Sequence, residues 1–449
     1  MEDTIAAIST ALGVGAISII RVSGNDSIKI VNEIFKGKDL SKQNTHTIHY
    51  GYIVDNEKII DEVLVSIMKS PKTFTKEDIV EINCHGGIAT TNKVLELVLN
   101  KGARLAEPGE FTKRAFLNGR IDLIEADGIM NLISSKTDKA RQLSINQLSG
   151  KVSNNIAYLR EELIKIISNI EVNIDYPEYE DIEVLSNEKI LPSIQLLKQK
   201  LTTIIKESED GKLINEGINV GIIGRPNVGK SSLLNSLLEE NKAIVTDIEG
   251  TTRDIVEGTI TLNGVVLNII DTAGIRKTDN IVEQIGVEKS YEIIDKSDLI
   301  IFVLNNNEEL TQEDLELYQK IQNKEHIIVL NKIDLEQKIN LDNIKEDIIK
   351  ISLKNNNADL ILNKIIEIYN LDKLEIKDQT YLSNARNISL LKKSLNNINN
   401  SITHIENNSP IDIVELELKE SWNTLGEIIG KTYTDELLDQ LFSRFCLGK

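Results

Sequence analysis

The spacing of apolar residues divides the first half of the chain into two kinds of segment. Residues 1 to about 118 mix short β-branched runs, at 16–22, 59–68 and 79–82, with helical stretches, which is typical of a compact α+β domain. From about 119 to 213 apolar residues instead recur at three- and four-residue steps, which predicts helices. Examples are Ile156, Leu159, Leu163, Ile166 and Ile170, and then Ile194, Leu197, Leu201 and Ile204.

The second half of the chain changes pattern twice more. Between about 214 and 372, apolar strand-like runs alternate with amphipathic helices, the signature of a parallel sheet built from βα units. Helical periodicity returns after 373, through Val414, Leu418, Trp422, Leu425 and Ile429. The simplest architecture is a multidomain α/β protein with an α+β domain at 1–118 and a discontinuous helical domain at 119–213 and 373–449. The α/β domain at 214–372 is inserted into that helical domain.

Composition narrows the class of protein. The 449 residues contain no apolar run approaching the roughly 20 that span a bilayer, and the N-terminus lacks the features of a signal peptide. We therefore expect a cytoplasmic protein with no membrane partner. Only two cysteines occur, Cys84 and Cys446, which argues against a disulfide framework or a structural zinc site.

The net charge of −19 argues against non-specific coating of nucleic acid, so any RNA contact must use a local basic surface. The segment 101–120 carries five basic residues against two acidic ones. It is either such a surface or, as charge runs usually are, a solvated face.

A phosphate-binding motif marks the inserted domain. The predicted buried strand at 218–223 runs directly into Gly224-Arg-Pro-Asn-Val-Gly-Lys-Ser231, a complete Walker A pattern followed by a helix. Glycines let successive backbone N–H groups face the phosphates, Lys230 reaches the β- and γ-phosphates, and the Ser231 hydroxyl binds Mg²⁺. The expected nucleotide contacts in this loop are Asn227, Val228, Gly229, Lys230, Ser231 and Ser232.

Three further motifs follow in the order found in Ras-like G domains. Another strand ends in Asp271-Thr272-Ala273-Gly274, which places a carboxylate near Mg²⁺ and a glycine near the γ-phosphate. The strand at 326–330 ends in Asn331-Lys332-Ile-Asp334, whose carboxylate can accept both guanine N–H donors, and adenine lacks that arrangement. Ser352-Leu353-Lys354 stands where GTPases usually carry Ser-Ala-Lys, with Leu353 as a departure. The sequence predicts a GTP-hydrolysing P-loop domain that uses Mg²⁺.

The residue after Gly274 is Ile275, where many small GTPases place a water-orienting glutamine. The Gly250-Thr-Thr-Arg-Asp254 motif and Asn227 are similar to those of the potassium-activated TrmE-Era-like GTPases, in which a monovalent cation stands in for an arginine finger. This resemblance implies that Thr252 joins Ser231 as a magnesium ligand and that Glu283 orients the attacking water. Glu283 alone would be read as an exposed carboxylate at a helix start. The implied potassium ligands are Asn227, Thr246, Ile248 and Thr251, and the implied nucleotide-contacting loop is Thr246, Asp247, Ile248, Glu249, Gly250, Thr251 and Thr252.

The resemblance extends over the whole chain to the tRNA modification GTPases of the MnmE, or TrmE, family. It rests on the N-terminal motifs ending at Gly24, Gly87 and Gly119 and on the terminal Phe-Cys-Leu-Gly-Lys449, where the family usually has isoleucine in place of Leu447. It implies an N-terminal domain that binds a tetrahydrofolate derivative and dimerises. The implied folate contacts are Arg21, Glu81, Arg120, which stands where lysine is common, and Lys449.

Two of these assignments keep alternatives. Glu81 could merely terminate a strand, and His85-Gly-Gly could be a plain turn. Cys446 is either a catalytic nucleophile, as thiolates are, or a small side chain near the folate.

The family resemblance also implies a function. A homodimer would join the flavoprotein MnmG in a heterotetramer and add an aminomethyl or carboxymethylaminomethyl group to carbon 5 of the wobble uridine of certain tRNAs. The alternative is a regulatory GTPase in ribosome assembly, of the Era or Der type, but the sequence shows no RNA-binding motif of a known class. A membrane-linked GTPase resembling dynamins would need a basic amphipathic or transmembrane segment, and the sequence shows none.

Overall fold

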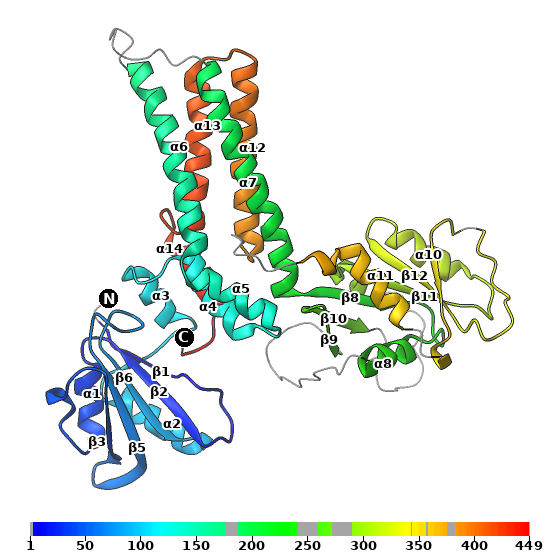
Figure 1. Ribbon diagram of the computed structural model, residues 1–449. Helices are drawn as coiled ribbons and strands as arrows, with labels where there is room; N and C mark the ends of the chain where they lie inside the picture. The colour runs from blue at the N-terminus through cyan, green and yellow to red at the C-terminus, as the bar shows by residue number, and fades with distance from the viewer. Residues whose placement is uncertain are drawn as a thin grey trace. The chain divides into compact units, whose positions relative to one another are not determined.

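A computed structural model describes residues 3–175, 187–240, 258–271, 290–342, 344–355, 358–374 and 382–448. The chain forms two compact units (Figure 1). Unit 1 contains Met1–Met130, Ser153–Leu191 and Asn396–Lys449, and unit 2 contains Asn131–Val152 and Pro192–Leu395. The fold class is confirmed: an N-terminal α+β domain, helices from two separate stretches of chain, and an α/β domain inserted between those stretches.

The N-terminal domain is built on a seven-stranded sheet in the order β3-β4-β5-β6-β2-β1-β7. Every neighbouring pair is antiparallel except β1 and β7. Two helices, α1 (Ser27–Ile34) and α2 (Ile88–Asn100), share one apolar core with alternate residues of the strands. The strands are β1 (Ile5–Ile8), β2 (Ile17–Ser23), β3 (Phe35–Lys36), β4 (Thr47–Asp55), β5 (Lys58–Met68), β6 (Ile79–His85) and β7 (Arg104–Leu105).

The other face of this sheet carries polar and exposed apolar side chains. In the register, Arg21 lies opposite Glu81, Glu81 opposite Ser66, and Ser66 opposite Ile48. Glu81 stands in the middle of β6, so the alternative that it merely terminates a strand is wrong.

The predicted helices are present, and their apolar periodicity marks buried faces. α6 (Lys151–Asp175) buries all five residues of its predicted stripe, and α7 (Asn187–Glu216) buries all four of its own. In unit 1, α6 contacts α13 (Ile411–Ile428): the Arg160 guanidinium lies 4.1 Å from the Trp422 ring centroid, and Lys419 pairs with Glu171 at 2.7 Å. The remaining helices outside the inserted domain are α3 (Glu110–Leu117), α4 (Leu123–Ser134), α5 (Asp138–Leu148), α12 (Ala385–Glu406) and α14 (Asp435–Phe442). Of these, α5 belongs to unit 2.

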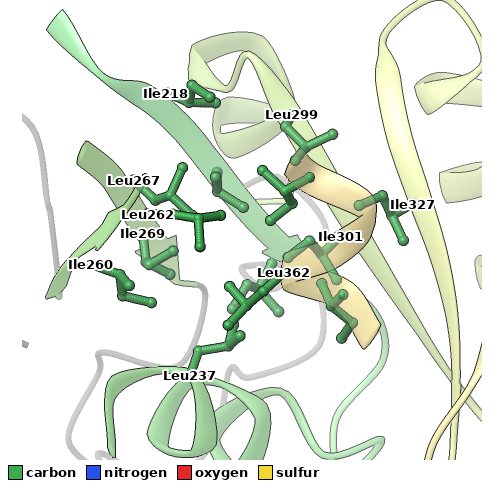
Figure 2. Packing of buried hydrophobic residues seen from close by; sticks show 14 of the residues in the cluster. Ile218, Leu237, Ile260, Leu262, Leu267, Ile269, Leu299, Ile301, Ile327 and Leu362 are labelled. Carbon is green, nitrogen blue, oxygen red and sulfur yellow. The ribbon is translucent and has the colours of Figure 1, made fainter. Parts of the chain in front are cut away.

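The inserted domain has a six-stranded sheet in the order β13-β12-β11-β8-β10-β9, parallel except for β9. Helices cover both faces, which is why a strand such as β11 buries all seven of its residues. Figure 2 shows one core, where Leu237 of α8 and Leu362 of α11 point at the strand side chains. The elements are β8 (Ile218–Ile223), α8 (Lys230–Glu240), β9 (Gly258–Leu262), β10 (Val265–Asp271), β11 (Leu299–Asn305), α10 (Gln312–Ile321), β12 (Glu325–Asn331), β13 (Ile348–Lys350) and α11 (Asp359–Tyr369).

The basic segment 101–120 is not a uniformly solvated face, because its arginine at position 114 is buried with a side chain only 1% exposed. The Arg114 guanidinium donates to the Asp3 carboxylate at 2.8 Å and the Glu110 carboxylate at 3.0 Å, and lies 3.2 Å from Glu77. Burial opposes the ionisation of Glu110, but hydrogen bonds from Arg104, the Glu107 N–H and Arg114 outweigh burial and lower its pKa. Arg114, one of the five basic residues of the segment, therefore has its charge paired with carboxylates inside unit 1.

Replacing Arg114 with methionine tests this cluster. We expect Arg114→Met to destabilise the N-terminal domain by roughly 3 kcal/mol, since removing one partner leaves buried carboxylates uncompensated, although Arg104 still contacts Glu110. Hydrogen exchange of the β1 and β2 amides measures the loss. Lys42→Met removes an exposed pair with Asp39 and serves as the control, with an expected effect below about 1 kcal/mol. Equal protection in the two variants would contradict the assignment.

Candidate functional site

The phosphate loop occupies residues 224–229, between the end of β8 and the start of α8. Its two glycines are required by close packing. Gly224 has φ +142°, and a Cβ there would lie 2.4 Å from the carbonyl oxygen of Val303 in β11. Gly229 has φ +108°, and a Cβ there would lie 2.2 Å from the Asn331 side-chain nitrogen. The backbone can therefore adopt this tight loop after the carboxyl end of β8 only with glycine at both positions.

The cationic and hydroxyl groups of this motif gather at the first turn of α8. The Lys230 ammonium donates to the carbonyl oxygens of Gly224 and Arg225, at 2.7 and 2.8 Å. Ser231 and Ser232 are exposed in the same turn. Because a helix N-terminus directs N–H groups and a partial positive charge outward, this arrangement suits a phosphate chain. The hydroxyl of Ser231 is the group here that suits a magnesium ion carried by those phosphates.

The segment 331–334, which is expected to recognise the base and is called the base-recognition segment below, is hydrogen-bonded directly to the phosphate loop. Asn331 is 3% exposed, and its amide donates to the carbonyl oxygen of Val228 at 2.9 Å. The Lys332 ammonium donates to the carbonyl oxygen of Asn227 at 2.8 Å. These two bonds hold the ends of β8 and β12 together, so the phosphate and base subsites form one piece.

The surroundings of Asp334 favour the ionised form of its carboxyl group. The Ser352 hydroxyl donates to it at 2.8 Å, and the Lys354 ammonium lies 3.6 Å away. The hydrogen bond from Ser352 is the main reason that the pKa of Asp334 lies below its ordinary value. Leu353 lies close to the phosphate loop, with a methyl carbon 3.7 Å from where a Cβ of Gly229 would lie.

Several expected site residues lie outside the described part of the chain. They are Thr246, Asp247, Ile248, Glu249, Gly250, Thr251, Thr252, Thr272, Ala273, Gly274, Glu283 and Lys449. Asp271 is the last residue of β10, and its backbone aligns with Ile222 of the parallel strand β8. The strand that leads into this motif thus ends at the same edge of the sheet as the phosphate loop.

A second cluster forms on the N-terminal domain, around three of the residues assigned to folate. The Arg21 guanidinium donates to Oε1 of Glu81 at 2.9 Å. It also lies 5.7 Å from the ring centroids of Phe74 and Phe111, and the Arg120 guanidinium lies 4.8 Å from Phe74. Two cations, a carboxylate and an aromatic ring thus meet on one surface.

The C-terminal tail reaches the same cluster. The carbonyl oxygen of Gly448 accepts from Arg21 Nη1 and from the Ser9 hydroxyl, both at 3.2 Å, and that of Cys446 accepts from the Gly109 N–H at 3.3 Å. Gly448 has φ +86°, and a Cβ there would lie 2.3 Å from the carbonyl oxygen of Ile8. The beginning and the end of the chain therefore form one site.

The two cysteines occupy contrasting environments. Cys446 is exposed, whereas Cys84 is buried and burial raises the pKa of its thiol. Of the two, Cys446 is the one accessible to a reaction partner.

Sequence reasoning missed Phe74 and the side-chain partners of Arg225 in the phosphate loop. Phe74 lies in an irregular loop with no motif of its own, and it packs against the core that contains Phe111. Arg225 pairs with Asp314 at 2.8 Å, across 89 positions of sequence that no local pattern links.

A parallel sheet with a phosphate loop after β8 and a guanine-type motif after β12 defines a P-loop GTPase domain. The family model described as GTP-binding protein TrmE N-terminus matches residues 4–120, and that described as MnmE helical domain matches residues 123–446. The chain therefore belongs to the MnmE (TrmE) family of tRNA modification GTPases, and it is a hydrolase that acts on GTP.

Two curated relatives agree with this assignment. The chain is 53% identical to a tRNA modification GTPase MnmE of Bacillus cytotoxicus, over 100% of this chain and 99% of that protein. It is 52% identical to the protein of the same description from Streptococcus mutans, with the same coverage. A solved structure of Era with MgGDPNP and 16S ribosomal RNA is 28% identical, covers 40% of this chain and 66% of that chain, and has a TM-score of 0.26. No helix among the described residues is long and apolar enough to cross a membrane.

Asp334 offers a direct test of the base subsite. We expect Asp334→Asn to weaken GDP binding about tenfold or more, because an amide cannot accept from both guanine N–H groups, and to improve binding of xanthosine diphosphate, whose C2 carbonyl can accept from the amide. Equilibrium titration with both nucleotides measures the change. Asp359→Asn, the same substitution at an exposed position of α11, should leave both affinities unchanged. Unaltered GDP affinity in Asp334→Asn would place base recognition elsewhere.

Proposed function

We propose that this protein uses GTP hydrolysis to drive modification of carbon 5 of the wobble uridine in certain tRNAs, as a homodimer that works with the flavoprotein MnmG in a heterotetramer. The added group is of the aminomethyl or carboxymethylaminomethyl type. Membership of a family of tRNA modification GTPases supports the general activity. The observation that carries the finer proposal is the meeting of Arg21, Glu81, Arg120 and the tail at one place.

The chemistry of that cluster fits a tetrahydrofolate derivative, which would supply a one-carbon unit when bound. Nε and Nη2 of Arg21 both contact Oε1 of Glu81, and no described residue hydrogen-bonds to Oε2 of Glu81, so Oε2 can accept from the N–H groups of a pterin. The exposed guanidinium of Arg120 suits a carboxylate of the folate tail. Phe74 offers a flat apolar surface for an aromatic ring. Lys449 would add a second cation from the terminus.

Cys446 is the residue that we assign to the modification chemistry itself. It is exposed, and its own backbone carbonyl is fixed by the Gly109 N–H, so the thiol is presented next to the folate cluster by a held segment of chain. A thiolate is a competent nucleophile.

A homodimer would use the open face of the N-terminal sheet. Ile17, Ile48, Tyr50 and Leu64 lie on this face and are 64%, 66%, 57% and 47% exposed. The register places Ile48 in the same cross-strand row as Arg21 and Glu81, Tyr50 and Leu64 in the adjacent row, and Ile17 in the row beyond it. An apolar surface of this kind is typical of a contact with another chain, and a second copy placed here would lie beside the folate cluster.

For hydrolysis we propose Mg²⁺ bound by Ser231 and Thr252, and K⁺ bound by Asn227, Thr246, Ile248 and Thr251. Asn227 is exposed with φ +63°, and no described residue hydrogen-bonds to its side chain, so its amide oxygen can serve as a ligand. K⁺ there would stabilise the negative charge of the transition state. Glu283 would orient the attacking water.

The cation assignment predicts GTP turnover that is much faster in K⁺ than in Na⁺ at equal ionic strength. Asn227→Gly should lose this stimulation without backbone strain, since glycine accepts a positive φ, and should largely keep GDP affinity because Lys230 and the loop remain. Asn227→Asp keeps an oxygen and tolerates the same backbone, so it should retain K⁺ dependence. Steady-state phosphate release in both salts gives the comparison, and equal rates for the parent protein would refute the K⁺ site.

The tail assignment predicts that Gly448→Ala separates the two activities. A Cβ at position 448 meets the β1 backbone, so the tail must leave its place, while the GTPase motifs lie elsewhere in the sequence. Modified wobble uridine, measured by mass analysis of tRNA from cells carrying the variant, should fall to a small fraction of the parent level, with GTP turnover preserved.

The control for this prediction is Leu447→Ala, because Leu447 is 46% exposed and its removal leaves the glycine contacts intact. Normal wobble modification in Gly448→Ala would mean that tail docking is not needed. Loss of GTP turnover together with modification would instead make the tail a structural element.

A further inference from the structure

Three consecutive asparagines, Asn305–Asn307, begin at the last residue of β11 and continue into a turn. In the structure they make ordered contacts, and Asn305 and Asn306 are each only 4% exposed. The Asn306 N–H donates to the carbonyl oxygen of Asn331 at 2.9 Å, and its side-chain amide donates to that of Leu335 at 3.0 Å. The Asn307 amide donates to the carbonyl oxygen of Glu336 at 2.9 Å. The asparagines therefore hold the backbone on both sides of Asp334.

The same loop also reaches the phosphate side of the site. The Asn305 amide donates to one oxygen of Glu308, and the other oxygen of Glu308 lies 3.3 Å from Nη2 of Arg225. Nη2 of Arg225 also donates to the carbonyl oxygen of Glu309 at 3.4 Å. Arg225 is a phosphate-loop residue whose own carbonyl accepts from Lys230. A continuous set of contacts thus runs from the base segment to the phosphate loop.

A buried carboxylate at the start of α10 completes this set. Asp314 has a side chain that is 1% exposed, and its Oδ2 lies 2.8 Å from Nε of Arg225. The same oxygen accepts from the N–H and the hydroxyl of Thr311, both at 3.0 Å, in a capping box. Arg225 is therefore fixed by a charge that is itself fixed by a helix terminus, away from the screening of solvent.

We propose that residues 305–314 form a brace that holds the phosphate loop and the base-recognition segment at a fixed spacing, and that Arg225 and Asn306 are positioning residues for GTP. A bound nucleotide contacts both loops at once. Any conformational freedom that either loop has before binding is lost on binding, and this entropy cost weakens the affinity. Arg225 positions Lys230, because its own carbonyl oxygen accepts a hydrogen bond from the Lys230 ammonium. Asn306 positions Asp334, because it hydrogen-bonds to the backbone on both sides of that residue.

Dissociation of a fluorescent GDP analogue tests the brace. Arg225→Met and Asn306→Ala should each raise the dissociation rate on the order of tenfold, and KM for GTP should rise by a larger factor than kcat falls. Arg225→Lys should give an intermediate rate, since an ammonium keeps the charge but cannot contact Asp314 and Glu308 as a fork does. Lys364→Met, which removes an exposed pair with Glu367 on α11, is the matched control and should leave the rate unchanged.

A double-variant cycle distinguishes positioning from general stability. Arg225→Met combined with Asp314→Asn should raise the dissociation rate little more than either change alone, because both remove one contact. Should these variants fail to fold, Glu308→Gln and Arg225→Lys keep the test open, since Glu308 is 44% exposed and tolerates substitution, and both should still speed dissociation severalfold. Dissociation within twofold of the parent in the folded variants, whatever their unfolding midpoints, would overturn the proposal.

Discussion

The close approach of the phosphate loop to the ends of β11 and β12 is the constraint on which the nucleotide site depends. Gly224 touches the backbone of β11, and Gly229 touches the side chain of Asn331 at the end of β12. Neither approach leaves room for a Cβ atom. Because the strands are parallel, their carboxyl ends meet at one edge, and the loop can be anchored there by atoms from three strands at once. This anchoring also sets the positions of Lys230 and Asp334, because the backbone that carries each of them cannot move independently of the other loop.

The second site of the protein depends on a different constraint, the meeting of the two ends of the chain. The main-chain carbonyls of Cys446 and Gly448 hold the tail by hydrogen bonds. Because this segment is held through its backbone, the side chain of Cys446 stays exposed. Upstream, Phe442 and Phe445 pack with Phe116 and supply the apolar contact that directs the tail to this place. In this arrangement Arg21 donates hydrogen bonds both to the carboxylate of Glu81 and to the carbonyl oxygen of Gly448 in the tail.

The sequence predicted the elements whose specification is local. The strand at 218–223 and the loop after it could be predicted because motif, strand and helix are contiguous in the sequence. The location of Asp334 after a strand could be predicted because its motif directly follows an apolar run. The burial of Arg114 could not be predicted, since its counter-charges Asp3 and Glu77 are 111 and 37 positions away. Phe74 was missed for the same reason: its place beside Arg21 and Arg120 depends on a tertiary contact with Phe111, and no local pattern encodes it. The motif positions in 246–252 and 272–283 lie outside the described residues and stay predictions.

The asparagine run at 305–307 shows how amide side chains can order an irregular segment of chain. Asparagine is common in loops because its side chain competes with the backbone for hydrogen bonds, and the same property lets it satisfy a backbone that no strand or helix satisfies. Here Asn306 and Asn307 bind the carbonyls of Leu335 and Glu336, in the irregular segment between β12 and β13. A hydrophobic residue at position 306 would leave the Leu335 carbonyl without that partner, and a charged residue would have to lose its hydration in a place that is 4% exposed. Amide side chains are therefore the chemically suitable choice beside a base-recognition loop, since they hold its backbone without adding a charge that would compete with Asp334.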